Sequence, residues 1–127
     1  MTPNVNSINW FEIPVLDFER AKKFYEYIFD LHMIEMEIND VKMALFPSEL
    51  NSRKVHGALC QGEGYEPSHK GVIIYLNGNP DLLEILNRVP KAGGKITLAK
   101  TMINEELGYM AFFNDTEGNR MALHSEQ

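Results

Sequence analysis

Five side chains in this sequence could carry chemistry, and all lie in short segments of strand-like composition: Trp10, Glu12, His56, Cys60 and His124. A carboxylate combined with two imidazoles is the ligand composition of many non-heme iron sites, and it would also suit zinc or nickel. The same carboxylate could instead act as a general base, or hold a ligand through a hydrogen bond. The types of residue therefore point to a metal site or to a polar ligand site.

The segments that position these residues belong to a unit that occurs twice. A strand, a capped helix and three short strands run through residues 8–60, and the same order returns through residues 71–125. A polar, turn-forming joint at residues 61–70 separates the two copies. An internal repeat outweighs local propensity when a fold is assigned. We therefore predict one α+β domain of two βαβββ modules in tandem, with curled mixed sheets around a shared cavity.

Alternation and capping define the start of the first module. Trp10 and Glu12 should share one face of a strand, with Phe11 and Ile13 on the opposite face. Asp17 stands where an N-cap carboxylate accepts hydrogen bonds from free backbone N–H groups, and apolar residues follow at helical spacing. The predicted helix should therefore cover the face that carries Phe11 and Ile13.

Turn-forming residues mark the remaining boundaries. Residues 39–40 are Asn-Asp, which favours a tight turn between two strands. The second module should open with a strand at 71–76, and Asn79 followed by Pro80 predicts the start of a helix. Residues 101–107 are expected to form a polar loop that folds over the cavity or lies exposed.

Composition excludes several classes of function. The chain has 127 residues, 44% of them hydrophobic, and a formal charge of -6 with no basic run, so nucleic-acid binding is not expected. No apolar stretch is long enough to span a membrane. The single cysteine cannot form an internal disulfide, and the first residues lack the pattern of a signal peptide. A cytoplasmic location is predicted.

Three motifs in order resemble one family. Residues 11–25 read FEIPVLDFERAKKFY, residues 92–95 read AGGK, and residues 113–120 read FNDTEGNR. Together they resemble the vicinal oxygen chelate superfamily, the group of glyoxalase I, bleomycin-resistance proteins, fosfomycin-resistance enzymes and extradiol dioxygenases. The resemblance covers nearly the whole chain. It implies paired βαβββ modules, a concave cavity for a small organic molecule, and a homodimer.

The resemblance also implies positions for metal ligands. Glyoxalase I-like members typically have a His near the start of each module's first strand and a Glu on each module's last strand. These positions fall on Trp10, on or beside Val72, near His56, and on Ala122. Trp10, Val72 and Ala122 cannot bind a metal through their side chains, so the standard metal set is not expected.

Three hypotheses remain open. If Trp10 and Ala122 face the cavity, alternation places Glu12 and His124 there too. The preferred hypothesis is a small-molecule binding site that uses no cofactor. A second is a displaced metal site of Glu12, His56 and His124, holding Zn, Ni, Fe or Mn in an isomerase, lyase or dioxygenase. A third is a regulatory or structural dimer with a vestigial cavity. In the first hypothesis the cavity is lined by Trp10, Glu12, His56, Cys60 and His124.

Overall fold

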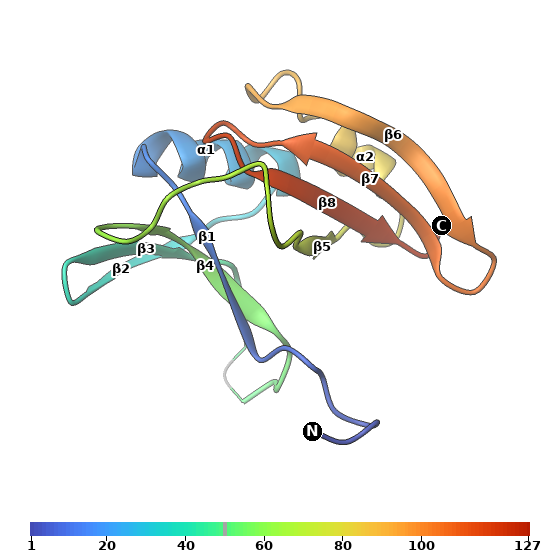
Figure 1. Cartoon of the computed structure of the whole chain (residues 1–127), viewed down its shortest axis with the longest axis horizontal. Helices are drawn as coiled ribbons and strands as arrows, with labels where there is room; N and C mark the ends of the chain where they lie inside the picture. The colour runs from blue at the N-terminus through green and yellow to red at the C-terminus, as the bar shows by residue number, and fades with distance from the viewer. Residues whose placement is uncertain (50) are drawn as a thin grey trace.

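Two four-stranded mixed sheets form the framework of the chain (Figure 1). The structure is a computed structural model, and it describes residues 1–49 and 51–127. The first sheet has the order β1-β4-β3-β2, and the second has the order β5-β8-β7-β6. The strands are β1 (Trp10–Pro14), β2 (Ile34–Ile38), β3 (Val41–Leu45), β4 (His56–Gln61), β5 (Tyr75–Asn77), β6 (Lys95–Asn104), β7 (Gly108–Asn114) and β8 (Arg120–Ser125).

Each sheet repeats the same pairing pattern. The first strand of each module pairs in parallel with the last, and the remaining pairs are antiparallel. Helix α1 (Phe18–Phe29) follows β1, and helix α2 (Leu83–Leu86) follows β5. This order confirms the predicted α+β fold of two βαβββ modules. None of the described helices combines the length and apolar composition needed to cross a bilayer.

Local sequence explains the start of α1. The Asp17 side chain accepts a hydrogen bond from the Arg20 N–H at 3.1 Å, as an N-cap should. The buried residues of the helix recur at helical spacing: Phe18, Ala21, Phe24, Tyr25 and Ile28. Ile13 is also fully buried, so α1 covers the predicted face of β1. The turn at residues 39–40 is also confirmed, with positive φ at both positions.

One core joins the helix-facing sides of both sheets. The rings of Phe24 on α1 and Phe113 on β7 lie 6.0 Å apart, and both side chains are buried. Leu59, Leu86 and Leu123 belong to the same cluster. The shared interior is therefore a packed core on the helix side of both sheets.

The opposite sides of the sheets remain open, which corrects the expectation of a hollow shared within one chain. On the first sheet, Ile34, Met36 and Ile38 are 67%, 41% and 44% exposed. On the second, Tyr75 is 47% exposed. Figure 1 shows the two sheets splayed apart rather than closed on each other. Within one chain, these faces do not enclose a cavity between them.

A buried polar cluster connects the two modules. The turn between β7 and β8 is polar, yet Asp115, Glu117 and Asn119 in it are almost fully buried. The Tyr25 hydroxyl donates to Asp115 Oδ2 at 2.7 Å, and Asn119 Nδ2 donates to the Pro14 carbonyl at 2.8 Å. This turn therefore holds α1 and the end of β1 against the second sheet.

Glu117 is the centre of this cluster. Its carboxylate accepts from the backbone N–H groups of Leu16 and Asp17 at 2.9 and 2.7 Å, and from Arg20 Nε at 2.8 Å. Burial raises the pKa of Glu117, but the bonds from Arg20, Asp17, Thr116 and Leu16 outweigh it, and the net pKa is lowered. Glu117 is therefore held as a carboxylate.

The second module departs from the predicted boundaries. Strand β5 spans Tyr75–Asn77, so only residues 75–76 of the expected strand at 71–76 belong to it. Helix α2 begins after Leu82, a position with no side-chain cap, and the Asn79 side chain accepts from the Glu126 N–H. Residues 101–104, expected as a loop, extend β6. Met102 and Ile103 in this segment suit a strand, and the hairpin with β7 extends through it.

Candidate ligand-binding site

The register of β1 and β4 brings four of the five predicted site residues onto one surface. Trp10 pairs with His56, and Pro14 pairs with Cys60, with Glu12 between them opposite Ala58. Because side chains of paired residues point to the same side of a sheet, these residues share a face. We call it the Glu12 face, defined by Trp10, Glu12, Pro14, His56, Ala58 and Cys60.

Two aromatic donors hold the Glu12 carboxylate. Trp10 Nε1 donates to Oε2 at 3.2 Å, and the Tyr65 hydroxyl donates to Oε1 at 2.9 Å. The hydrogen bond to Glu12 raises the pKa of the Tyr65 hydroxyl, which keeps the phenol protonated as a donor. Each carboxylate oxygen has a second lone pair, so Glu12 can accept further hydrogen bonds from a ligand.

Sequence reasoning missed Tyr65. It lies in the joint between the modules, which was interpreted only as a turn-forming segment. Tyr65 is the only aromatic residue in the GEGYEPSHK stretch of residues 62–70. An isolated aromatic residue in a polar segment was the signal that could have identified it, because such a side chain usually finds a packing partner.

From β4 to β2, the sheet face beside Glu12 is largely apolar. Met43 pairs with Cys60 and Leu45 pairs with Ala58, and Met36 pairs with Met43 in turn. The same face therefore continues from Glu12 across β4 and β3 to the exposed side chains of β2. A single carboxylate amid aliphatic and thioether side chains suits a ligand that is largely apolar and carries one hydrogen-bond donor.

A small cavity of about 260 Å³ opens beside Glu12, between β1 and the start of β8. Glu66, Ser68 and Arg120 contribute polar groups to it. Arg120 Nε is buried and has no hydrogen-bond partner among the described residues. Arg120 itself lines the cavity, so its guanidinium offers further N–H donors to a carbonyl or carboxylate oxygen of a ligand.

Cys60 is the predicted site residue that can do the least chemistry. Its side chain is fully buried, and burial followed by the nearby Glu12 carboxylate raises the pKa of the thiol to about 12. The thiolate is the reactive form of cysteine, so the native thiol is inert at neutral pH. Cys60 contributes apolar surface beneath Glu12.

We expect native Cys60 to react with iodoacetamide at pH 8 roughly a thousandfold more slowly than an ordinary thiol of pKa ~8.5. The elevated pKa and burial act in the same direction. Mass spectrometry of a time course in buffer and in 6 M guanidinium would measure the ratio. Comparable rates in the two solvents would contradict the assigned protonation state.

His124 does not join the other predicted site residues. It lies on β8 of the second sheet, where it pairs with Asn77 and Met110, and its Nε2 contacts the Leu107 carbonyl. Across residues 1–49 and 51–127, no three His, Cys, Asp or Glu side chains are grouped as a metal site. The proposed set of Glu12, His56 and His124 is therefore not assembled within one chain, because its members are divided between two splayed sheets.

The pairing register of the strands also refines the metal-ligand positions that the family resemblance implies. Cys60 pairs with Met43 in the first module, as His124 pairs with Met110 in the second. Cys60 and His124 are therefore equivalent positions. Ala58 and Ala122, each two residues before them, are equivalent as well. The position expected near His56 falls on Ala58, whose side chain cannot bind a metal.

The same comparison locates the remaining position. Pro14 pairs with Cys60 as Asn77 pairs with His124, so Trp10 corresponds to Ile73, beside the expected Val72. Val72 itself is 91% exposed and lies outside the strands. The four positions are thus occupied by Trp10, Ala58, Ile73 and Ala122, and these residues do not fit a metal ion.

Comparison with known proteins agrees with this architecture. The sequence model described as "Glyoxalase/Bleomycin resistance protein/Dioxygenase superfamily" matches residues 7–123. No curated protein matches the chain.

Several solved structures share the fold. A glyoxylase/bleomycin resistance protein/dioxygenase domain from Frankia sp. EAN1pec has a TM-score of 0.69 and 15% identity, over 98% of this chain and 100% of that one. TnmS3, an antibiotic binding protein from Streptomyces sp. CB03234, has a TM-score of 0.65 and 17% identity, over 99% and 100%. A glyoxalase I mutant from Zea mays has a TM-score of 0.66 and 18% identity, over 93% of this chain and only 45% of that longer one.

Proposed function

Because the chain belongs to the Glyoxalase/Bleomycin resistance protein/Dioxygenase superfamily, we propose that it binds a small organic molecule on the Glu12 face. The ligand is largely apolar and presents a hydrogen-bond donor to the Glu12 carboxylate. No metal takes part in this binding. Glu12 acts as an anchor whose position is set by Trp10 and Tyr65.

The observation that carries this proposal is the orientation of Glu12. Tyr65 and Trp10 each donate to a different carboxylate oxygen, at 2.9 and 3.2 Å. A carboxylate held at two points on an apolar surface is already oriented for a ligand, so less ordering is needed on binding. Arg120, which lines the adjoining cavity, supports a ligand that also carries an oxygen acceptor.

The proposal includes a homodimer. The Glu12 face continues into Ile34, Met36 and Ile38, which a monomer leaves exposed to water. Exposed apolar patches of this kind favour a protein interface, and burial of that surface is favourable at roughly 25 cal/mol per Å². A second copy would cover the outer part of this face and enclose the ligand. The likeness to an antibiotic binding protein supports a binding role within the same fold. A cytoplasmic location is part of the same proposal.

A thermal-shift screen of small amines, phenols, amides and aromatic natural products tests the proposal, because a ligand that binds only the folded state raises the midpoint. The chain has one tryptophan, Trp10, which donates to Glu12. A ligand at this site should therefore change Trp10 fluorescence, and it should do so equally well in EDTA. Light scattering with chromatography should give the mass of a dimer. Binding that is lost in EDTA and restored by zinc or nickel would overturn the metal-free proposal, as would a screen with no shift.

A further inference from the structure

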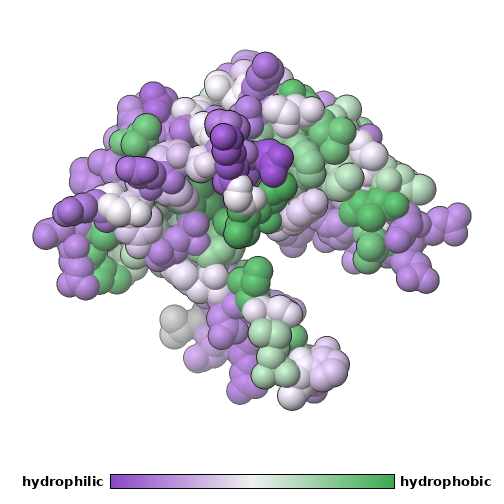
Figure 2. All heavy atoms as spheres, viewed as in Figure 1, coloured by the Kyte–Doolittle hydropathy of each residue, from purple (hydrophilic) through white to green (hydrophobic). Residues whose placement is uncertain are grey.

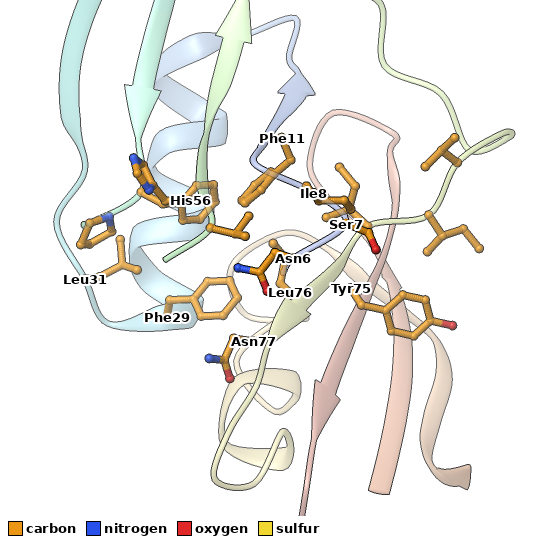
Figure 3. A pocket seen from close by; sticks show the side chains of 16 residues that line it. Asn6, Ser7, Ile8, Phe11, Phe29, Leu31, His56, Tyr75, Leu76 and Asn77 are labelled. Carbon is orange, nitrogen blue, oxygen red and sulfur yellow. The ribbon is translucent and has the colours of Figure 1, made fainter. Parts of the chain in front are cut away.

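A second and larger cavity lies on the other side of β1. Phe11 alternates with Glu12 along the strand, so its side chain points away from the Glu12 face. It contributes to a cavity of about 790 Å³ between the first module and β5. Figure 3 shows Ile8, Phe11 and Phe29 around this space, with Leu76 of β5 at its other side. We call it the Phe11 cavity; of the residues that define the Glu12 face, only His56 at the start of β4 lines it.

An aromatic cluster forms one wall of the Phe11 cavity. The rings of Phe11 and Phe46 are 5.6 Å apart and tilted by 47°, and those of Phe29 and Phe46 are 6.3 Å apart and nearly perpendicular. Tyr25 packs edge-on against Phe46 from the core side. These are the separations at which aromatic rings attract one another, so a planar ligand could extend the cluster.

The lining is poor in ionisable side chains. Within the described part of the chain, no Asp, Glu, Lys or Arg contributes to it, and Asn6, Ser7, His56 and Asn77 are among its few polar residues. An ionised ligand would lose its hydration there without a charged partner, which costs several kcal/mol or more. The composition selects against ions and for neutral molecules.

The size and setting of the cavity suit a small molecule. Its volume falls within the ~300–1,000 Å³ of typical ligand sites, and such sites often lie between packed units. In the space-filling view, the molecule is hollowed between the projecting N-terminal end and the second sheet, with apolar atoms at the head of the hollow (Figure 2). The wall residues Phe11, Phe29 and Phe46 are partly exposed, so the aromatic wall is accessible from solvent.

We propose that the Phe11 cavity is a second binding site, separate from the Glu12 face, for an uncharged aromatic molecule with at most one or two hydrogen-bonding groups. The site is formed by the aromatic wall of the first module and by the residues of β5 opposite it. This inference does not depend on the function proposed for Glu12. Either site could fail its test while the other passes.

Nile red, a neutral dye whose emission rises in apolar surroundings, is the probe. We expect saturable binding to the wild-type protein, and displacement by 2-naphthol at least tenfold more effectively than by 2-naphthoate. The two competitors have the same ring system and differ in charge. Equal displacement by both, or no saturable binding, would overturn the proposal.

A matched pair of variants tests whether Nile red binds in the Phe11 cavity. Ile8 and Val5 are 57% and 54% exposed in the N-terminal segment outside the strands, but only Ile8 lines the cavity. Ile8→Glu should weaken the affinity for Nile red about tenfold or more, and Val5→Glu should leave it within about twofold. Nuclear Overhauser effects from bound 2-naphthol should reach Phe46 and Leu76. Equal losses in the two variants, or contacts with the Trp10 indole alone, would overturn the assignment.

Discussion

Replacement of Glu117 by alanine should lower the free energy of unfolding by about 3 kcal/mol. The Glu117 side chain is 0% exposed, and its loss leaves the partly buried hydrogen bonds from the N–H groups of Leu16 and Asp17 without their acceptor. Arg20 also loses its partner, although it is half-exposed and water can solvate it. A loss of this size is large against the ~5–15 kcal/mol that holds a typical domain folded.

Urea unfolding, followed by far-UV circular dichroism, measures this effect. Glu19→Ala is the matched control, because Glu19 is an exposed carboxylate in the first turn of the same helix. It should change stability by no more than about 0.5 kcal/mol. If Glu117→Ala unfolds at the same urea concentration as Glu19→Ala, the turn between β7 and β8 does not hold the two modules together.

Because the pKa of Glu117 is lowered, the stability that its contacts contribute depends on pH. A carboxyl group whose pKa is lower in the folded state contributes stability above its unfolded pKa of ~4.3, and loses it as the pH falls through the folded pKa. The raised pKa of buried Asp115 acts with the opposite sign, but it is present in wild type and in Glu117→Gln alike. The stability difference between these two proteins should therefore shrink below about pH 4.5. A constant difference down to pH 3 would contradict this account.

Replacement of Glu12 by glutamine should weaken binding at the Glu12 face by about ten- to a hundredfold. The amide has nearly the same shape, but it carries no charge and turns one acceptor into a donor. That donor would face the Trp10 indole or the Tyr65 hydroxyl, both of which now donate to Glu12. Hydrogen bonds to a charged acceptor contribute roughly 1.5–3 kcal/mol, which corresponds to this range of affinity.

Isothermal titration with the compound that gives the largest thermal shift measures the change. Glu63→Gln is the control, because Glu63 is an exposed carboxylate close to Tyr65 in the same joint. Its affinity should stay within about twofold of wild type. Tyr65→Phe should cause a smaller loss than Glu12→Gln, since it removes only one of the two donors that orient the carboxylate. Undiminished affinity in Glu12→Gln would show that the anchor is elsewhere.

Much of the first module could be predicted because its signals are local. The Asp17 cap, the apolar spacing of α1 and the turn at residues 39–40 act over a few residues, and the structure confirms all three. Alternation along two strands also placed Glu12 and His56 on one face correctly. Such patterns depend on backbone geometry that neighbouring residues determine by themselves.

The second module was harder to predict, for two different reasons. Asn79 has the chemistry of a helix cap, but the Glu126 N–H, distant in sequence, donates to its side-chain oxygen. Residues 101–104 were expected to belong to one loop with residues 105–107, but Met102 and Ile103 suit a strand, and the nearby strand β7 pairs with them as part of β6.

The sequence by itself determined the repeat, the family and the residues that occupy β1 and β4, because periodicity and motif order are properties of the chain. Only the tertiary structure decided which side chains meet. It brought Tyr65 from the joint to Glu12, kept His124 on the other sheet, and buried Asp115 and Glu117 between the modules. These outcomes depend on how the two sheets are oriented, and that orientation follows from packing of the shared core rather than from any local pattern.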